Sequence, residues 1–77
     1  MKIFLSSTLR KYIPGYNPDK GHEIEVQKGI TVSDLCEQLD ILPSMVTIIM
    51  VDGRAKNHDY VLKGTERVHL FPAIGGG

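Results

Sequence analysis

Three consecutive glycines, residues 75–77, are the part of this sequence whose composition points most directly to chemistry. They follow Phe71-Pro72 after only Ala73 and Ile74. Glycine is costly to order and offers no side chain to pack, so three in succession are of little use to a folded core. They are useful if the backbone itself is the functional group. From Ala73 to Gly77 an extended chain reaches roughly 17 Å, enough to enter the cleft of a partner protein.

The functional group that such a tail presents is the carboxylate of Gly77. It is ionised at neutral pH, which makes it a poor electrophile but a competent nucleophile toward an activated phosphate. Adenylation by ATP would convert it to an acyl group with a good leaving group. Sulfide or a persulfide would then displace AMP and leave a thiocarboxylate. The alternative interpretation is that the glycines are a frayed end of the chain or a cloning remnant.

The remaining nucleophilic and titratable side chains show no catalytic spacing. Cys36 lies on the apolar stripe of a predicted helix, and a cysteine buried in apolar surroundings is usually inert. His22, His58 and His69 are not spaced as metal ligands, so we expect no metal site. His58-Asp59 could form a polarised pair, although a turn with Asp59 as a local cap fits the sequence better. His69 alternates with apolar positions, which places it on the exposed face of the last strand.

Length and charge exclude several classes of protein. A chain of 77 residues allows one domain with a thin core, which leaves little room for a deep private active site. Nine basic and nine acidic side chains give zero formal charge, which argues against a nucleic-acid binder. Residues 46–51, the longest mostly apolar run, are too short to span a membrane, and Ser6 interrupts the apolar start before it could serve as a signal peptide. We therefore expect a cytoplasmic protein without membrane or nucleic-acid partners.

The elements that must position the tail begin with two strands. Residues 2–8 open with Ile3-Phe4-Leu5 and are predicted to form the first strand. Residues 12–21 are dense in proline, glycine and asparagine and are predicted to form a loop. Residues 22–28 alternate apolar with polar side chains, which predicts a half-buried second strand.

One helix is predicted from an apolar stripe that starts at Val32 and repeats at i+3, i+4 and i+7. Thr31 is placed as its N-cap, and the charge of Asp34 three residues later suits the start of a helix. We expect the helix to end near Asp40, because Pro43 disfavours helical geometry in the residue before it.

Three more strands follow the helix. They are residues 46–51, 54–56 and 67–72, separated by a hairpin turn at Asp52-Gly53 and by turns within residues 57–65. One helix can cover one face of a four- or five-stranded sheet, so the expected fold class is α+β. The other face then meets water or a partner. We expect one domain, residues 1–72, followed by a flexible tail, residues 73–77.

Four segments, in this order, resemble the ubiquitin-like sulfur carriers, the family that includes the small subunit of molybdopterin synthase and the sulfur carrier of thiamine biosynthesis. They are residues 1–5 leading to Leu9-Arg10, Gly29–Leu35, Val51–Arg54 and Leu62–Gly77. Each segment alone is weakly specific. Their order, together with the Phe-Pro approach to a final Gly-Gly, is fairly specific.

The resemblance implies a β-grasp fold with the first and last strands parallel at the centre of a mixed sheet. It implies an adenylating partner of the ubiquitin-activating type, which consumes ATP, and a sulfurtransferase or cysteine desulfurase as the sulfur source. The chain would bind no cofactor and would act as a non-catalytic sulfur-donating subunit. In the molybdopterin branch, the thiocarboxylated tail inserts into the large subunit of the synthase and gives up its sulfur there.

The resemblance also implies site residues. Gly76 and Gly77 match the terminal diglycine, and Gly75 extends the tail. Phe71 matches an aromatic residue that helps the sheet dock on partners, and the neighbouring partner-binding candidates are Pro72, Ile74 and His69.

The branch of the family is left open among several pathways. Length and the Phe-Pro approach favour molybdopterin biosynthesis over thiamine biosynthesis, and related carriers also serve cysteine synthesis, transfer-RNA thiolation and tungsten cofactors. Two other classes compete. A protein modifier would be joined through Gly77 to lysines of its targets, and a plain binding module would use the sheet face with the tail incidental.

Overall fold

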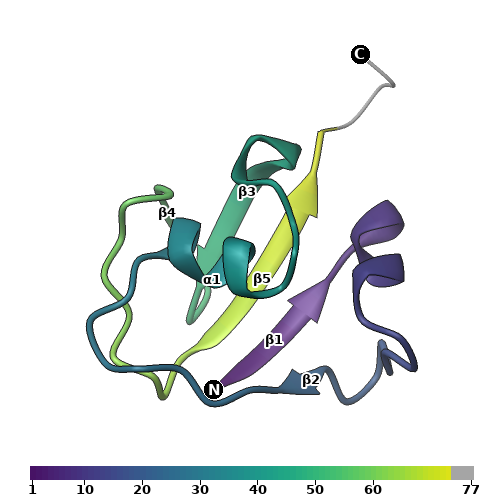
Figure 1. The fold of residues 1–77 in the computed structure, drawn as a ribbon, viewed down its shortest axis with the longest axis horizontal. Coiled ribbons are helices and arrows are strands. Elements are labelled where there is room, and N and C mark those ends of the chain that lie inside the picture. Colours follow the sequence, from purple (N-terminus) through teal and green to yellow (C-terminus); the bar gives the residue numbers. More distant parts are fainter. Residues whose placement is uncertain (74–77) are drawn as a thin grey trace.

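The computed structural model describes residues 1–73, which form a five-stranded mixed sheet with one α-helix lying across one of its faces (Figure 1). The strands stand in the order β2-β1-β5-β3-β4. Their bounds are Lys2–Leu5 for β1, His22–Glu23 for β2, Val46–Val51 for β3, Arg54–Lys56 for β4 and Arg67–Pro72 for β5. The helices are α1 (Val32–Gln38) and two short 3-10 helices, η1 (Ser7–Tyr12) and η2 (Pro43–Met45).

The centre of the sheet is the parallel pair of β1 and β5. Ile3 stands opposite Val68, and Leu5 stands opposite Leu70. All four side chains are buried and belong to the same hydrophobic core as Leu35 of α1. The first and last strands are therefore central neighbours, as the β-grasp fold requires, and the predicted α+β class is confirmed.

The start of α1 follows the sequence prediction. The hydroxyl of Thr31 accepts a hydrogen bond from the backbone N–H of Asp34 at 3.1 Å. The carboxylate of Asp34 accepts one from the N–H of Thr31 at 3.0 Å. These two bonds make a capping box, with aspartate in place of the more usual glutamate or glutamine.

The helix ends where it was expected but for a different reason. The N–H of Ile41 donates to the carbonyl of Cys36, and the N–H of Asp40 donates to that of Glu37. This pair of bonds is a Schellman motif, in which Asp40 takes the left-handed conformation with φ of 61°. Local capping therefore stops α1, and Pro43 instead begins η2.

The first strand is shorter than predicted. It ends at Leu5, and the residues predicted to continue it to Thr8 turn into η1 instead. Ser7 has φ of 52°, a left-handed conformation that breaks extended backbone. β2 does not reach the last residue of β1, where side chains bond to the backbone instead. The N–H of Leu5 donates to the hydroxyl of Tyr16, and the Nε of Arg10 donates to the carbonyl of Leu5.

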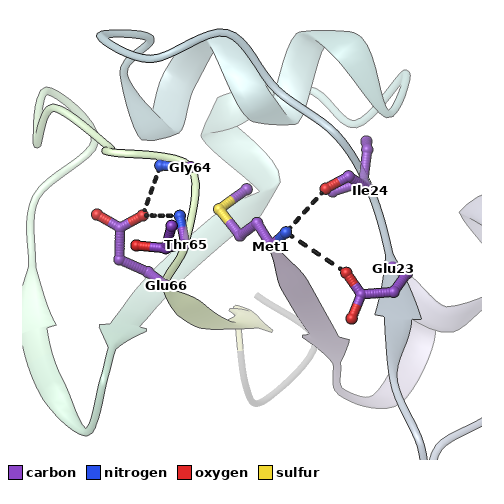
Figure 2. A network of polar contacts seen from close by, with 6 residues as sticks. All are labelled: Met1, Glu23, Ile24, Gly64, Thr65 and Glu66. Carbon is purple, nitrogen blue, oxygen red and sulfur yellow. Dashed lines mark hydrogen bonds and ion pairs between the residues drawn. The ribbon is translucent and has the colours of Figure 1, made fainter.

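The second strand is also shorter than predicted, since only His22–Glu23 pairs with β1. The contact continues to Ile24, whose N–H donates to the carbonyl of Met1. The amino group of Met1 in turn donates to the carbonyl of Ile24 (Figure 2). Residues 25–28 then pass beyond the end of β1 and find no strand partner. The predicted alternation of burial nevertheless holds, with Ile24 and Val26 packed on the core.

The remaining strands agree with the sequence prediction. β3 and β4 form a hairpin around Asp52-Gly53, whose φ values of 51° and 81° are the left-handed pair that this two-residue turn needs. In β5, Val68 and Leu70 are buried whereas Arg67, His69 and Phe71 are not.

The turn that leads into β5 is organised by one buried carboxylate. Glu66 is 6% exposed, and its two oxygens accept hydrogen bonds from the N–H groups of Lys63, Gly64 and Thr65. Figure 2 shows the carboxylate folded back on Gly64 and Thr65. Burial raises the pKa of Glu66, but the backbone hydrogen bonds outweigh it and leave the pKa below its usual value.

We predict that this carboxylate makes stability depend on acid. Because its pKa is lower in the folded state, its stabilising contribution is present above the unfolded-state pKa and is lost as the pH falls through the folded-state pKa. In urea denaturation at a series of pH values, Glu66→Gln should lower the free energy of unfolding most near neutral pH and progressively less in acid. Glu25→Gln, at an exposed position, is the control. A difference between wild type and Glu66→Gln that does not change with pH would contradict the assignment.

Candidate functional site

The face of the sheet opposite α1, the outer face, carries five large side chains from three strands. They are Phe4 of β1, Ile48 and Met50 of β3, and His69 and Phe71 of β5. We call these five residues the outer patch. The strand register places Phe4 and Met50 beside His69, and Ile48 beside Phe71. All five are partly exposed, with Ile48 the most exposed at 44%. A contiguous, partly exposed apolar surface of this kind is typical of a protein-interaction site.

His69 sits between the two phenylalanines of the patch. Its ring meets Phe4 edge to face at 4.7 Å between centroids, and it meets Phe71 in the same manner at 6.3 Å. The guanidinium carbon of Arg67 lies 5.3 Å from the centroid of Phe4. The patch is thus aromatic at its centre and cationic at the end where β5 begins, and its aromatic rings are held by mutual contacts.

The structure brings three of the predicted partner-binding residues together. His69 and Phe71 lie within the outer patch, and Pro72 ends the same strand. The prediction that His69 faces outward is confirmed by its half-buried position between buried Val68 and Leu70. Ile74, Gly75, Gly76 and Gly77 lie outside the described residues.

Cys36, the chain's single cysteine, is fully buried in the core. Burial raises the pKa of its thiol to about 11. The thiolate is the nucleophilic form of cysteine, so burial and the raised pKa both disfavour reaction of Cys36 with sulfur donors at neutral pH. The prediction that Cys36 is structural and inert agrees with this position.

His58 is a structural residue whose role the sequence did not reveal. Its Nε2 lies 2.9 Å from the carbonyl oxygen of Pro43 and 2.8 Å from that of Val46. These two acceptors require Nε2 to carry the proton, so the ring ties the loop after β4 to the start of β3. Within residues 1–73, no group of histidine, cysteine, aspartate and glutamate side chains is arranged to hold a metal ion.

Sequence reasoning missed three members of the outer patch, namely Phe4, Ile48 and Met50. Each lies in an uninterrupted apolar run, where alternation cannot tell which side chains face the core. Their positions follow from the register with β5, whose clear alternation assigns Val68 and Leu70 to the core. Pairing with an alternating neighbour is the signal that could have found them.

Comparison with known proteins identifies the family of this chain. A model of the ThiS family matches residues 11–77, so the chain belongs to the ThiS family. No curated protein matches the chain. Members of this family are ubiquitin-like sulfur carriers, which work with adenylating enzymes and sulfurtransferases. Residues 1–73 contain no helix long and apolar enough to cross a bilayer.

We predict that two substitutions of apolar residues, one in the outer patch and one on the core side of α1, separate binding from folding. Phe71→Ala should lower the free energy of unfolding by about 1 kcal/mol and weaken binding to the adenylating enzyme, because Phe71 is partly exposed in the outer patch. Leu35→Ala should cost about 2–5 kcal/mol of stability, because it empties fully buried volume. Urea denaturation and calorimetric titration measure the two effects. A loss of stability in Phe71→Ala as large as that in Leu35→Ala would refute the outward assignment.

We also predict that Cys36 reacts only when the protein unfolds. At neutral pH, a small thiol-alkylating reagent should label the folded chain far more slowly than the chain in urea, because the thiol is buried and protonated. Mass spectrometry of the labelled chain measures the rate. Rapid labelling of folded protein would show that Cys36 is accessible and reactive, and would contradict its assignment as a structural residue.

Proposed function

We propose that Gly77 carries the sulfur. Its carboxylate attacks ATP on the adenylating partner, which forms an acyl-adenylate and releases pyrophosphate. Hydrosulfide then displaces AMP and leaves a thiocarboxylate; where the donor is a persulfide, a second thiol cleaves the acyl disulfide that forms first. The thiocarboxylate donates its sulfur in molybdopterin biosynthesis, for a molybdenum or tungsten cofactor, after the tail enters the large subunit of the synthase. The ATP belongs to the activating partner.

The observation that carries this proposal is the family match, which runs through the glycines to residue 77. The position of Cys36 supports it, because a sulfur carrier with one inert, buried cysteine has no side-chain thiol on which to hold a persulfide. The backbone carboxylate is then the group left to carry sulfur. The small core supports the same conclusion. A domain of 77 residues has little room for a deep active site, so we infer that partners supply the catalytic groups.

The outer patch is proposed as the surface that presents the tail. Phe71, Pro72 and His69 lie on β5, the strand that leads directly to the glycines, and Ile74 follows them in sequence. A partner that binds the patch therefore holds the root of the tail at its own surface. The same surface would serve the adenylating enzyme and the synthase subunit in turn.

The acceptor pathway is proposed from the Phe-Pro approach to the glycines, which favours molybdopterin synthase over thiamine biosynthesis. A carrier for thiamine, cysteine or transfer-RNA thiolation is the first alternative. A protein modifier is the second, because amide formation with lysine begins with the same adenylation. Conjugates of increasing mass in the host would identify a modifier.

We predict that protein purified from its own host contains a species heavier by the exchange of one oxygen for sulfur. Intact mass spectrometry would detect it, and alkylation or hydrolysis should remove it. A chain lacking Gly77 should fold with unchanged stability, because glycine has no side chain to pack, but should not be adenylated. Pyrophosphate release by the host's activating enzyme measures the second effect.

The control is Gly15→Ala in the same assays, since Gly15 lies in an exposed loop far along the chain from the tail. Its conformation, with φ of 74°, leads us to expect a modest loss of stability but normal adenylation. Detection of carboxylate alone, even after incubation with the activating enzyme, ATP and a sulfur source, would contradict the sulfur-carrier mechanism at Gly77.

A further inference from the structure

The last strand ends in a contact that involves the root of the tail. The hydroxyl of Thr47 in β3 donates a hydrogen bond of 3.1 Å to the carbonyl oxygen of Pro72 in β5. Pro72 also stands opposite Val46 in the strand register. In Figure 1, the chain leaves the sheet at this end of β5, beside the start of β3.

The hydrogen bond from Thr47 compensates for a backbone hydrogen bond that Pro72 cannot donate. Pro72 has no N–H, so residue 72 cannot donate to β3 and hold the end of the strand in the usual way. Its carbonyl belongs to the same rigid peptide plane as the N–H of Ala73. A hydrogen bond to that carbonyl therefore restrains the orientation of the peptide through which the chain leaves β5.

The position of Thr47 is itself determined by the fold. The register between β3 and β5 shifts between Val46 and Ile48, which leaves Thr47 as the extra residue of an irregularity in the ladder. The carbonyl of Val46 on one side is bonded to the ring of His58, and Ile48 on the other side is paired with Phe71. Thr47 is thus held between two fixed neighbours and directed at Pro72.

We propose that Thr47 is a positioning residue for the activation of Gly77. The inference rests on the proposed function. With the peptide between Pro72 and Ala73 oriented before docking, a partner bound to the outer patch meets the exit of the chain from β5 in a defined orientation. Without the hydroxyl, docking through the patch is unchanged, but fewer of the docked molecules have the tail in the productive direction.

The first test measures the contact directly and does not depend on the activity. In nuclear magnetic resonance relaxation of the full chain, the order parameter of the Ala73 N–H should fall in Thr47→Val, which keeps the branched shape and removes the hydroxyl. It should be restored in Thr47→Ser, which keeps the hydroxyl. Thr65→Val, the same chemical change in the exposed turn before β5, is the matched control and should leave Ala73 unchanged.

The second test separates positioning from docking in the kinetics of adenylation by the host's activating enzyme. Thr47→Val should lower kcat about three- to tenfold, the ratio expected from the loss of one hydrogen bond, and should leave KM for the carrier unchanged. Thr47→Ser should be close to wild type. Phe71→Ala should show the opposite split, with KM raised. Calorimetric binding without ATP should give equal affinities for wild type and Thr47→Val.

The outcomes distinguish the two levels of the proposal. If wild-type protein is not adenylated, the proposed function fails, and the role of Thr47 in activation fails with it. If wild type is adenylated and Thr47→Val matches it in kcat, the positioning role alone is overturned. An Ala73 order parameter that does not respond to Thr47→Val would overturn it as well. A defect shared equally by Thr47→Val and Thr47→Ser would trace to side-chain shape and would also refute the role of the hydroxyl.

Discussion

The parallel pairing of β1 with β5 is the constraint on which the rest of this structure depends. It joins residues 2–5 to residues 67–70, almost the full length of the chain, so it forms only when both ends of the domain come together. β2 adds to the free side of β1, and β3 adds to the free side of β5. Once this pair is in register, Ile3, Leu5, Val68 and Leu70 face α1, and Phe4 and His69 must face away from it.

The strand β5 combines three roles that follow from one alternation. Its inward residues complete the core, its outward residues His69 and Phe71 are two of the five members of the outer patch, and Pro72 ends the ladder. A change in register of one residue would exchange the first two sets and destroy both. The outer patch and the exit of the chain from the sheet therefore depend on the same strand. The hydroxyl of Thr47 in β3 bonds to Pro72 at the end of β5, and His58 bonds to the carbonyl of Val46 at the adjacent start of β3.

The distribution of chemistry in the molecule fits a sulfur carrier. A domain of this size has a small core, and its one thiol, that of Cys36 in α1, is buried within that core. The buried polar side chain of residues 1–73 is that of Glu66, and its carboxylate accepts hydrogen bonds from backbone N–H groups and so stabilises the fold. What remains for partners is a surface and, in our proposal, a backbone carboxylate that other proteins activate and use.

Local features of this protein were determined by the sequence alone. The capping box at Thr31, the hairpin at Asp52-Gly53, the alternation of β5, the buried stripe that holds Cys36 and the existence of a glycine tail all depend on residues close together in the chain. The tertiary structure decided where β1 ends and that only His22–Glu23 of residues 22–28 form a strand. It also decided which apolar residues of β1 and β3 form the outer patch, and it brought His58 and Thr47 to carbonyl groups far along the chain. Those outcomes depend on which strand lies alongside, and a strand partner many residues away leaves no periodic trace in the segment that it pairs with.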